Sequence, residues 1–174
     1  RPGPASGVPT YTEQGDLQYA LNVGHGDFLR VVASPGTIEE AYYLAAELLN
    51  IAWNFQTPTI LLTEKHLSEC SMSVNIKPED TKWAEYKNYE KKEDEQYKRY
   101  QDMNDGISPL LFPPHDEVIV WNSYEHDELG NTTENPTLTA KMHEKRLRKK
   151  RTFVEYLKEN KSINHYGHSG PIIF

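Results

Sequence analysis

The stretch from residue 29 to residue 63 restricts the possible folds more than any other part of this chain. Residues 29–34 (LRVVAS) predict a strand, and a Pro-Gly turn follows them. Thr37 and Glu40 then show the capping-box spacing that begins a helix. Apolar residues continue at the spacing of an amphipathic helix to about Phe55. Residues 59–63 (TILLT) predict a second strand, short and apolar as in a buried parallel sheet.

Two strands joined through a helix by short links predict a right-handed βαβ crossover. The fold class predicted for residues 29–63 is therefore α/β, with a parallel core. An antiparallel pairing of these two strands would contradict it.

A short helix is predicted ahead of this core, over residues 11–21. Thr10 or Thr12 can cap it, and the acidic Glu13 and Asp16 lie near its positive N-terminus.

The stretch after the core, residues 66–135, is polar and holds few apolar runs. Residues 82–100 mix both signs of charge with aromatic residues, which fits a solvated helix and an irregular segment equally well. Residues 116–121 predict a short strand.

A long helix is predicted from Asn135-Pro136 to about residue 159, because proline suits the first turn of a helix. Its expected apolar stripe consists of Leu138, Met142, Leu147, Val154 and Leu157. The basic run at residues 145–151 (KRLRKKR) could hold RNA or phosphate groups, but it lacks interleaved aromatic residues for stacking on bases. A solvated face, or contact with the acidic residues 93–95, is the expectation.

Charge and cysteine usage exclude several classes of protein. The formal net charge of −7 argues against a general nucleic-acid binder. The single cysteine, Cys70, cannot supply the thiolates of an iron–sulfur cluster or an internal disulfide, and it suits a reducing compartment. No apolar run approaches the roughly 20 residues that span a membrane, and no signal segment is visible. We therefore expect a cytoplasmic protein with no membrane partner.

The first ten residues, RPGPASGVPT, cannot form a helix, because each proline fixes its own backbone and biases the residue before it toward extended geometry. Gly3 and Gly7 allow sharp turns and close approach to a ligand. By composition alone, this segment also fits a proline-rich surface loop or a frayed terminus.

Together with the EQGDL at residues 13–17, this segment resembles the substrate loop of the 2-oxoacid:ferredoxin oxidoreductases, which are thiamine-diphosphate enzymes. Ala5-Ser6 departs from the Ser-Thr that the family often has there. Further segments resemble the family's alpha subunit in order along the chain: NVGHGDF (22–28), RVVASPGTIEEAY (30–42), YKRY (97–100), DGISP (105–109), WNSYEHDELG (121–130) and MHEKRLRK (142–149).

The resemblance implies the fold of part of a thiamine-diphosphate-binding-type parallel sheet with flanking helices. Residues 1–65 would be the C-terminal portion of a pyrimidine-binding-type domain and 66–135 a polar connector. Residues 136–160 would be a helix and 161–174 the entry to a following domain. The family's upstream segment, with the glutamate that activates the aminopyrimidine, is missing from the sequence. We therefore expect an interior piece of a longer subunit.

The resemblance implies a part in the oxidative decarboxylation of a 2-oxoacid to acyl-CoA, with ferredoxin as electron acceptor. Thiamine diphosphate and magnesium would belong to the complete enzyme, and an iron–sulfur cluster to a partner chain or domain. This chain alone would bind none of them and be inactive. Its partners would be the beta subunit, ferredoxin and CoA, with no nucleic acid. The alternative is a non-catalytic assembly module that uses the helix at 37–55 and the polar connector.

Arg1 is the residue expected to bind the substrate, because a guanidinium matches a planar carboxylate with two parallel hydrogen bonds. The resemblance implies the same role. Ser6 and Thr10 are expected to orient the carboxylate or carbonyl, although small hydroxyls also bond to local turn backbone. We assign no catalytic residue to this chain.

The histidines give weaker signals. His25, between two glycines, could shuttle protons near a cofactor or be a plain loop residue. His115, His126 and His143 lack the spacing of a zinc site, so no metal is assigned.

Overall fold

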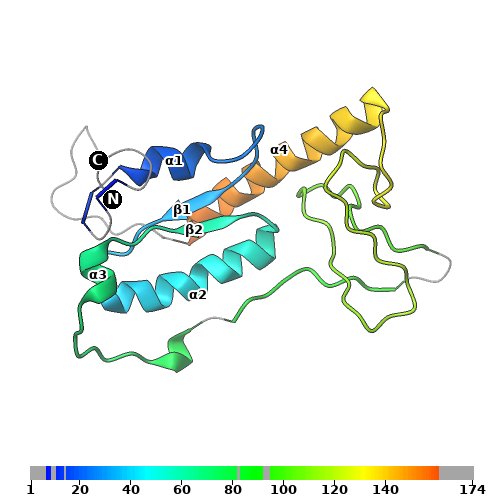
Figure 1. The fold of residues 1–174 in the computed structure, drawn as a ribbon. Helices are drawn as coiled ribbons and strands as arrows, with labels where there is room; N and C mark the ends of the chain where they lie inside the picture. The colour runs from blue at the N-terminus through cyan, green and yellow to red at the C-terminus, as the bar shows by residue number, and fades with distance from the viewer. Residues whose placement is uncertain (1–6, 9–10, 14, 82, 92–94, 161–174) are drawn as a thin grey trace.

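The computed structural model describes residues 7–8, 11–13, 15–81, 83–91 and 95–160 (Figure 1). Their elements are, in chain order, α1 (Asp16–Asn22), β1 (Val31–Ala33), α2 (Ile38–Phe55), β2 (Thr59–Leu61), α3 (Lys65–Glu69), the 3-10 helix η1 (Pro78–Asp80) and α4 (Pro136–Glu159). None of the helices in these ranges is both long and apolar enough to cross a membrane.

The predicted parallel core is confirmed. β1 and β2 pair in parallel, with Val32 opposite Ile60 at the centre of the register, and α2 connects them. Both strands are shorter than predicted, at three residues each.

The start of α2 follows from the capping pattern. Thr37 Oγ1 accepts a hydrogen bond of 3.1 Å from the backbone N–H of Glu40. The Glu40 carboxylate reaches back one residue further than in a standard capping box and accepts from Gly36 N at 2.7 Å. The helix ends where Gln56 adopts a left-handed backbone with φ of 47°.

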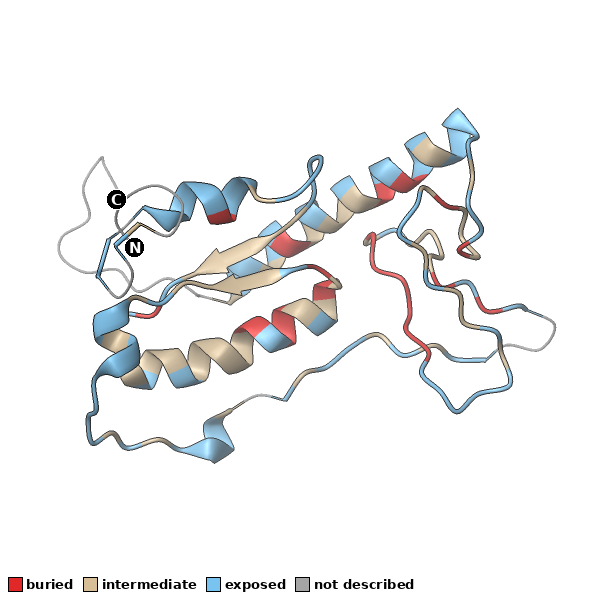
Figure 2. Ribbon diagram, viewed as in Figure 1, coloured by how far each residue is buried: buried red, intermediate tan, exposed pale blue. Residues whose placement is uncertain are grey.

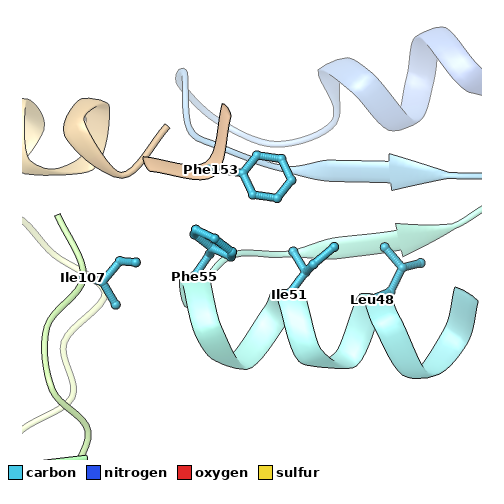
Figure 3. Packing of buried hydrophobic residues seen from close by; sticks show 5 residues of the cluster. All are labelled: Leu48, Ile51, Phe55, Ile107 and Phe153. Atoms are coloured by element: carbon cyan, nitrogen blue, oxygen red, sulfur yellow. The ribbon is translucent and has the colours of Figure 1, made fainter. Parts of the chain in front are cut away.

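The apolar core lies where α2 meets the C-terminal half of α4. Leu48, Ile51 and Phe55 of α2 are buried, with Phe153 of α4 and Ile107 of the connector against them (Figure 3). The rings of Phe55 and Phe153 meet edge to face with their centroids 5.0 Å apart. Helix α4 therefore closes a core that began about 100 residues earlier in the chain.

The helix predicted from residue 136 is confirmed, and Asn135 caps it by accepting from the N–H groups of Thr137 and Leu138. The predicted apolar stripe is wrong apart from Met142, which is 2% exposed. Leu147, for example, is 59% exposed. The face that packs against the protein instead carries Met142, Lys145 and Phe153, because the connector offers polar acceptors to the lysine.

The predicted start and cap of the helix before the core are corrected. Helix α1 begins at Asp16 with Gly15 at its N-cap and no capping side chain, so Thr12 does not cap it. Thr12 is instead bonded to Glu64, a tertiary partner that the local pattern does not reveal. Thr10 lies outside the described residues.

The described part of residues 82–100 is irregular, which settles the choice against a solvated helix there. The strand predicted at residues 116–121 does not form, and Val118 in its middle is 73% exposed. This stretch lacks the neighbouring strand that a ladder needs; the connector's bridges are isolated, as between Asn88 and Leu110.

The connector is nevertheless ordered around a buried strip. Residues 106–111 are buried in an unbroken row (Figure 2). Tyr97, 2% exposed, donates its hydroxyl to Pro109 O at 3.1 Å and accepts from Leu111 N at 3.2 Å. A side chain thus satisfies backbone groups that a strand partner would otherwise satisfy.

Candidate functional site

The residues predicted to bind substrate, Arg1, Ser6 and Thr10, lie outside the described residues. The structure does describe the end of the same loop. Gly7 has a positive φ of 54°, which favours glycine, and Tyr11 N donates to Val8 O at 3.4 Å.

A hydrogen bond joins the loop end to the segment after β2. Thr12 Oγ1 donates a hydrogen bond of 2.6 Å to Glu64 Oε2. The same carboxylate caps α3 by accepting from His66 N at 2.9 Å and Leu67 N at 2.7 Å. The bond from Thr12, followed by that from His66, holds the pKa of Glu64 below its usual range.

This bond places the loop end at the carboxyl edge of the parallel sheet. β1 ends at Ala33 and β2 at Leu61, and Leu62 N donates to Ala33 O at 2.8 Å. In Figure 1 the described start of the chain lies beside α3, at this end of the strands. Ligands of open α/β sheets bind beyond the carboxyl ends of the strands.

An open cavity of about 620 Å³ lies beside the loop end. Tyr11 and Thr12 line it from the loop, and residues of α3 and its C-cap line it from the other side: Lys65, His66, Glu69 and Cys70. Lys65 pairs with Glu69 at 3.3 Å on an exposed surface. Cys70 is exposed, and its thiol donates a weak bond to Leu67 O at 3.6 Å.

The four histidines considered from sequence are not brought together into a site. His25 is exposed in a turn where Gly24 and Gly26 both have positive φ. His115 accepts from Glu117 N at 3.1 Å, and His143 lies 3.0 Å from a Glu125 carboxylate oxygen. Within the described ranges, no three His, Cys, Asp or Glu side chains gather as ligands for a metal.

His126 differs from the other three histidines in being buried. Its ring stacks on Tyr100 with the centroids 3.7 Å apart, and its Nδ1 lies 2.9 Å from Asp127 O.

The basic run of α4 does not form the solvated face that was expected. Lys145 is buried, and Lys149 donates to Gln56 O at 2.8 Å. Arg148 pairs with Asp102, and Arg146 pairs with Glu125 at 3.2 Å. The described acidic partners of the run, Asp102 and Glu125, thus lie in the connector. The expected contact with residues 93–95 cannot be followed, because residues 93 and 94 lie outside the described residues.

Sequence reasoning missed this polar interface, although one signal for it was available. Met142, Lys145, Lys149 and Phe153 follow one another at intervals of three or four residues, which places them on one face of a helix. Two of the four are lysines, however, and lysines on a helix usually indicate a solvated face.

The chain matches a protein family over residues 1–145, and that family is described as "Pyruvate flavodoxin/ferredoxin oxidoreductase, thiamine diP-bdg". It is 37% identical over 175 residues to the 2-oxoacid:ferredoxin oxidoreductase subunit alpha of Saccharolobus solfataricus, covering 97% of this chain and 27% of that one. It is 37% identical over 92 residues to the 2-oxoglutarate synthase subunit KorA of Archaeoglobus fulgidus, covering 53% of this chain and 25% of that one.

A solved structure is similar in fold as well. This is the 2-oxoglutarate:ferredoxin oxidoreductase from Magnetococcus marinus with 2-oxoglutarate, coenzyme A and succinyl-CoA bound. The TM-score is 0.80 at 31% identity, over 90% of this chain and 27% of that one. The chain therefore spans about a quarter of the length of the relatives that it matches.

Proposed function

The chain belongs to the pyruvate flavodoxin/ferredoxin oxidoreductase family, and from this premise we propose that it is the part of an alpha subunit that binds the carboxylate of a 2-oxoacid. In the complete enzyme the bound 2-oxoacid is oxidatively decarboxylated to acyl-CoA with ferredoxin as acceptor. The observation that carries this proposal is the bond between Thr12 and Glu64, which fixes the end of the loop at the carboxyl edge of the sheet.

In this proposal Arg1 holds the substrate carboxylate through two parallel N–H donors. Ser6 and Thr10 orient the carboxylate or the neighbouring carbonyl. Thr12, bonded to Glu64, is the fixed point from which the loop extends.

The described residues at this edge do not fit a role in activating thiamine diphosphate. One carboxylate there is that of Glu64, which already accepts hydrogen bonds from Thr12, His66 N and Leu67 N. The other is that of Glu69, which is paired with Lys65. Thiamine diphosphate supplies the decarboxylation chemistry when it is bound to the complete enzyme. This segment contributes substrate recognition and contact surface.

We assign the remaining components to the rest of the enzyme. An iron–sulfur cluster needs more thiolates than the single Cys70 supplies, so it belongs to a partner chain or domain. Magnesium and the diphosphate are assigned to the beta subunit, and ferredoxin and CoA bind the assembled complex. The single exposed thiol suits a cytoplasmic, reducing location.

A ligand-stability experiment on the assembled enzyme tests the proposal. Pyruvate and 2-oxoglutarate are added separately, and the melting temperature is followed for the wild type, Arg1→Ala and Arg151→Ala. Arg151 is an exposed arginine on α4 and serves as the matched control. We expect at least one 2-oxoacid to raise the melting temperature of the wild type and of the control, but not of Arg1→Ala. An equal rise in all three would reject the role of Arg1.

A further inference from the structure

A second, smaller cavity lies between the connector and α4. Its volume is about 150 Å³, which is room for several water molecules or one small oxyanion. The residues that line it come from the end of α2, the connector and α4, and they include Gln56, Arg99, Ser108, Lys145, Arg146 and Lys149. Of these cations, Arg146 is paired with Glu125 at 3.2 Å. This cavity is less open to solvent than the one beside the loop.

Three cations of this lining donate to neutral oxygens. Lys145 Nζ donates to Tyr100 O at 2.9 Å and to Ser108 Oγ at 2.5 Å. Lys149 Nζ donates to Gln56 O at 2.8 Å, and Arg99 Nη1 donates to Gln56 Oε1 at 3.0 Å. None of these acceptors carries a negative charge, so the positive charge of the cluster is left uncompensated by its hydrogen bonds.

The nearest carboxylates have other partners. Asp102 pairs with Arg148 and lies 3.5 Å from Lys141, and Glu128 pairs with Lys141 at 2.8 Å. Among the ion pairs of the described ranges, none includes Arg99, Lys145 or Lys149.

Two of the three cations are also withdrawn from water, and Lys149 is half-buried. Arg99 and Lys145 are each 7% exposed. Arg99 lies over the ring of Trp121, 4.4 Å from its centroid, and its Nε is buried without a hydrogen-bond partner in the described part of the chain. Buried charges in proteins are usually paired, because an unpaired one loses its hydration without compensation.

Electrostatics agrees with this geometry. Burial, followed by the charges of Lys149 and Arg99, lowers the pKa of Lys145 to about 7. Burial and the charges of Arg146 and Arg99 lower the pKa of Lys149 to about 8. An anion in the cavity would oppose both shifts.

We infer that this cavity binds a phosphate group, held by Arg99, Lys145 and Lys149. A phosphate matches the site better than a carboxylate does, because it can accept from donors on several sides and carry two negative charges against three cations. Arg99 supplies a planar pair of donors and the lysines supply point charges. The bound group is either free phosphate or the phosphate end of a larger molecule. This inference does not depend on the proposed role of Arg1.

Calorimetric titration of the complete enzyme tests it, at constant ionic strength set with chloride. Inorganic phosphate and adenosine monophosphate are titrated separately into the wild type, Lys149→Met and Lys150→Met. Lys150 is the next residue on α4 and is exposed, so its variant removes the same charge outside the cavity. We expect Lys149→Met to weaken binding of phosphate at least about tenfold, as the loss of a charged hydrogen bond does, and Lys150→Met to leave it unchanged within about twofold.

The two probes separate the possible sources. Binding of phosphate alone identifies a site for the free ion, and binding of both identifies a site for a phosphate monoester. The inference is overturned if neither probe binds. It is also overturned if Lys149→Met and Lys150→Met lose affinity for phosphate equally. An acidic side chain from the rest of the enzyme filling the cavity would give the first of these results.

A second measurement covers variants that fold poorly. Phosphate is expected to raise the melting temperature of the wild type and Lys150→Met above that in chloride of equal ionic strength, and not to raise that of Arg99→Gln. A rise of the same size in Arg99→Gln would count against the site.

Discussion

The hydroxyl of Tyr156 near the end of α4 donates a hydrogen bond of 2.5 Å to the Glu47 carboxylate in the middle of α2, across 109 positions of sequence. Burial and this carboxylate raise the pKa of Tyr156 well above its usual range. The bond thus adds a polar connection beside the contact of Phe55 with the Tyr156 ring.

Removal of this bond is expected to destabilise the subunit. Tyr156→Phe deletes the donor and keeps the ring, so the free energy of unfolding should fall by about 1.5–3 kcal/mol, as for a hydrogen bond to a charged group. Urea unfolding of Tyr156→Phe, Glu47→Gln and the double variant gives the coupling energy. Additive effects of the two substitutions would show that the bond contributes nothing.

Gly106 is expected to tolerate no side chain. A Cβ there would lie 2.5 Å from both Lys145 O and Lys149 N, and its φ is 76°. Gly26 is the matched control, because it has a φ of 75° with nothing within 4 Å of a Cβ. Gly106→Ala should therefore lower the free energy of unfolding by at least about 2 kcal/mol more than Gly26→Ala does. Equal losses would mean that α4 moves away from the connector at little cost.

Arg1→Ala is expected to lower kcat/KM of the assembled enzyme about ten- to a hundredfold, since charged hydrogen bonds contribute roughly 1.5–3 kcal/mol. Arg1→Lys should recover part of this, because an ammonium lacks the planar pair of donors. The affinity for thiamine diphosphate should stay unchanged. Steady-state kinetics with several 2-oxoacids and a cofactor titration test both statements. A parallel loss of cofactor affinity would indicate a structural role for Arg1 instead.

The stability of the interface between the connector and α4 is expected to rise with pH. Burial, followed by the charges of Lys149 and Arg99, lowers the pKa of Lys145 to about 7, and the charges of Asp102 and Glu128 oppose this shift. Between about pH 7 and the ordinary lysine value near 10.4, the unfolded chain holds a proton that the folded chain has released. The free energy of unfolding should therefore rise across this window, by at most about 1.4 kcal/mol per pH unit for this lysine.

Lys145→Met should flatten this pH dependence, whereas Lys150→Met should leave it as in the wild type. Unfolding in urea at several pH values between 7 and 10 measures both slopes. Saturating phosphate should also flatten the wild-type slope, because a bound anion keeps the lysines charged. If the slope of Lys145→Met matched that of the wild type, another group would have to titrate.

The core could be predicted from sequence because its signals are local. The capping residue Thr37, the periodicity of α2 and the two apolar stretches all lie within 35 residues, and each favours the same crossover. The start of α1 was not predictable in this way, since the hydroxyl of Thr12 is used in a bond to Glu64, 52 positions away.

The order of the connector, by contrast, could not be predicted from local signals. Its order depends on Tyr97, whose hydroxyl satisfies backbone groups of Pro109 and Leu111, and no periodicity announces such a contact. The cationic cavity was hidden for a similar reason. Lys145 is buried by packing against the connector, whereas a lysine on a helix is usually exposed. The proposed substrate loop has no local signal of this kind either, since only its resemblance to a family, and not its pattern of apolar residues, indicates a role in binding substrate.

The contact between Phe55 and Phe153 has a consequence for synthesis on the ribosome. The apolar face of α2 is made about 100 residues before the ring that covers it. At about 5–20 residues per second, Leu48, Ile51 and Phe55 wait roughly 5–20 s for their partner to emerge. The nascent chain is therefore open to chaperones and to aggregation during this interval, and a pause in translation before residue 153 would lengthen it.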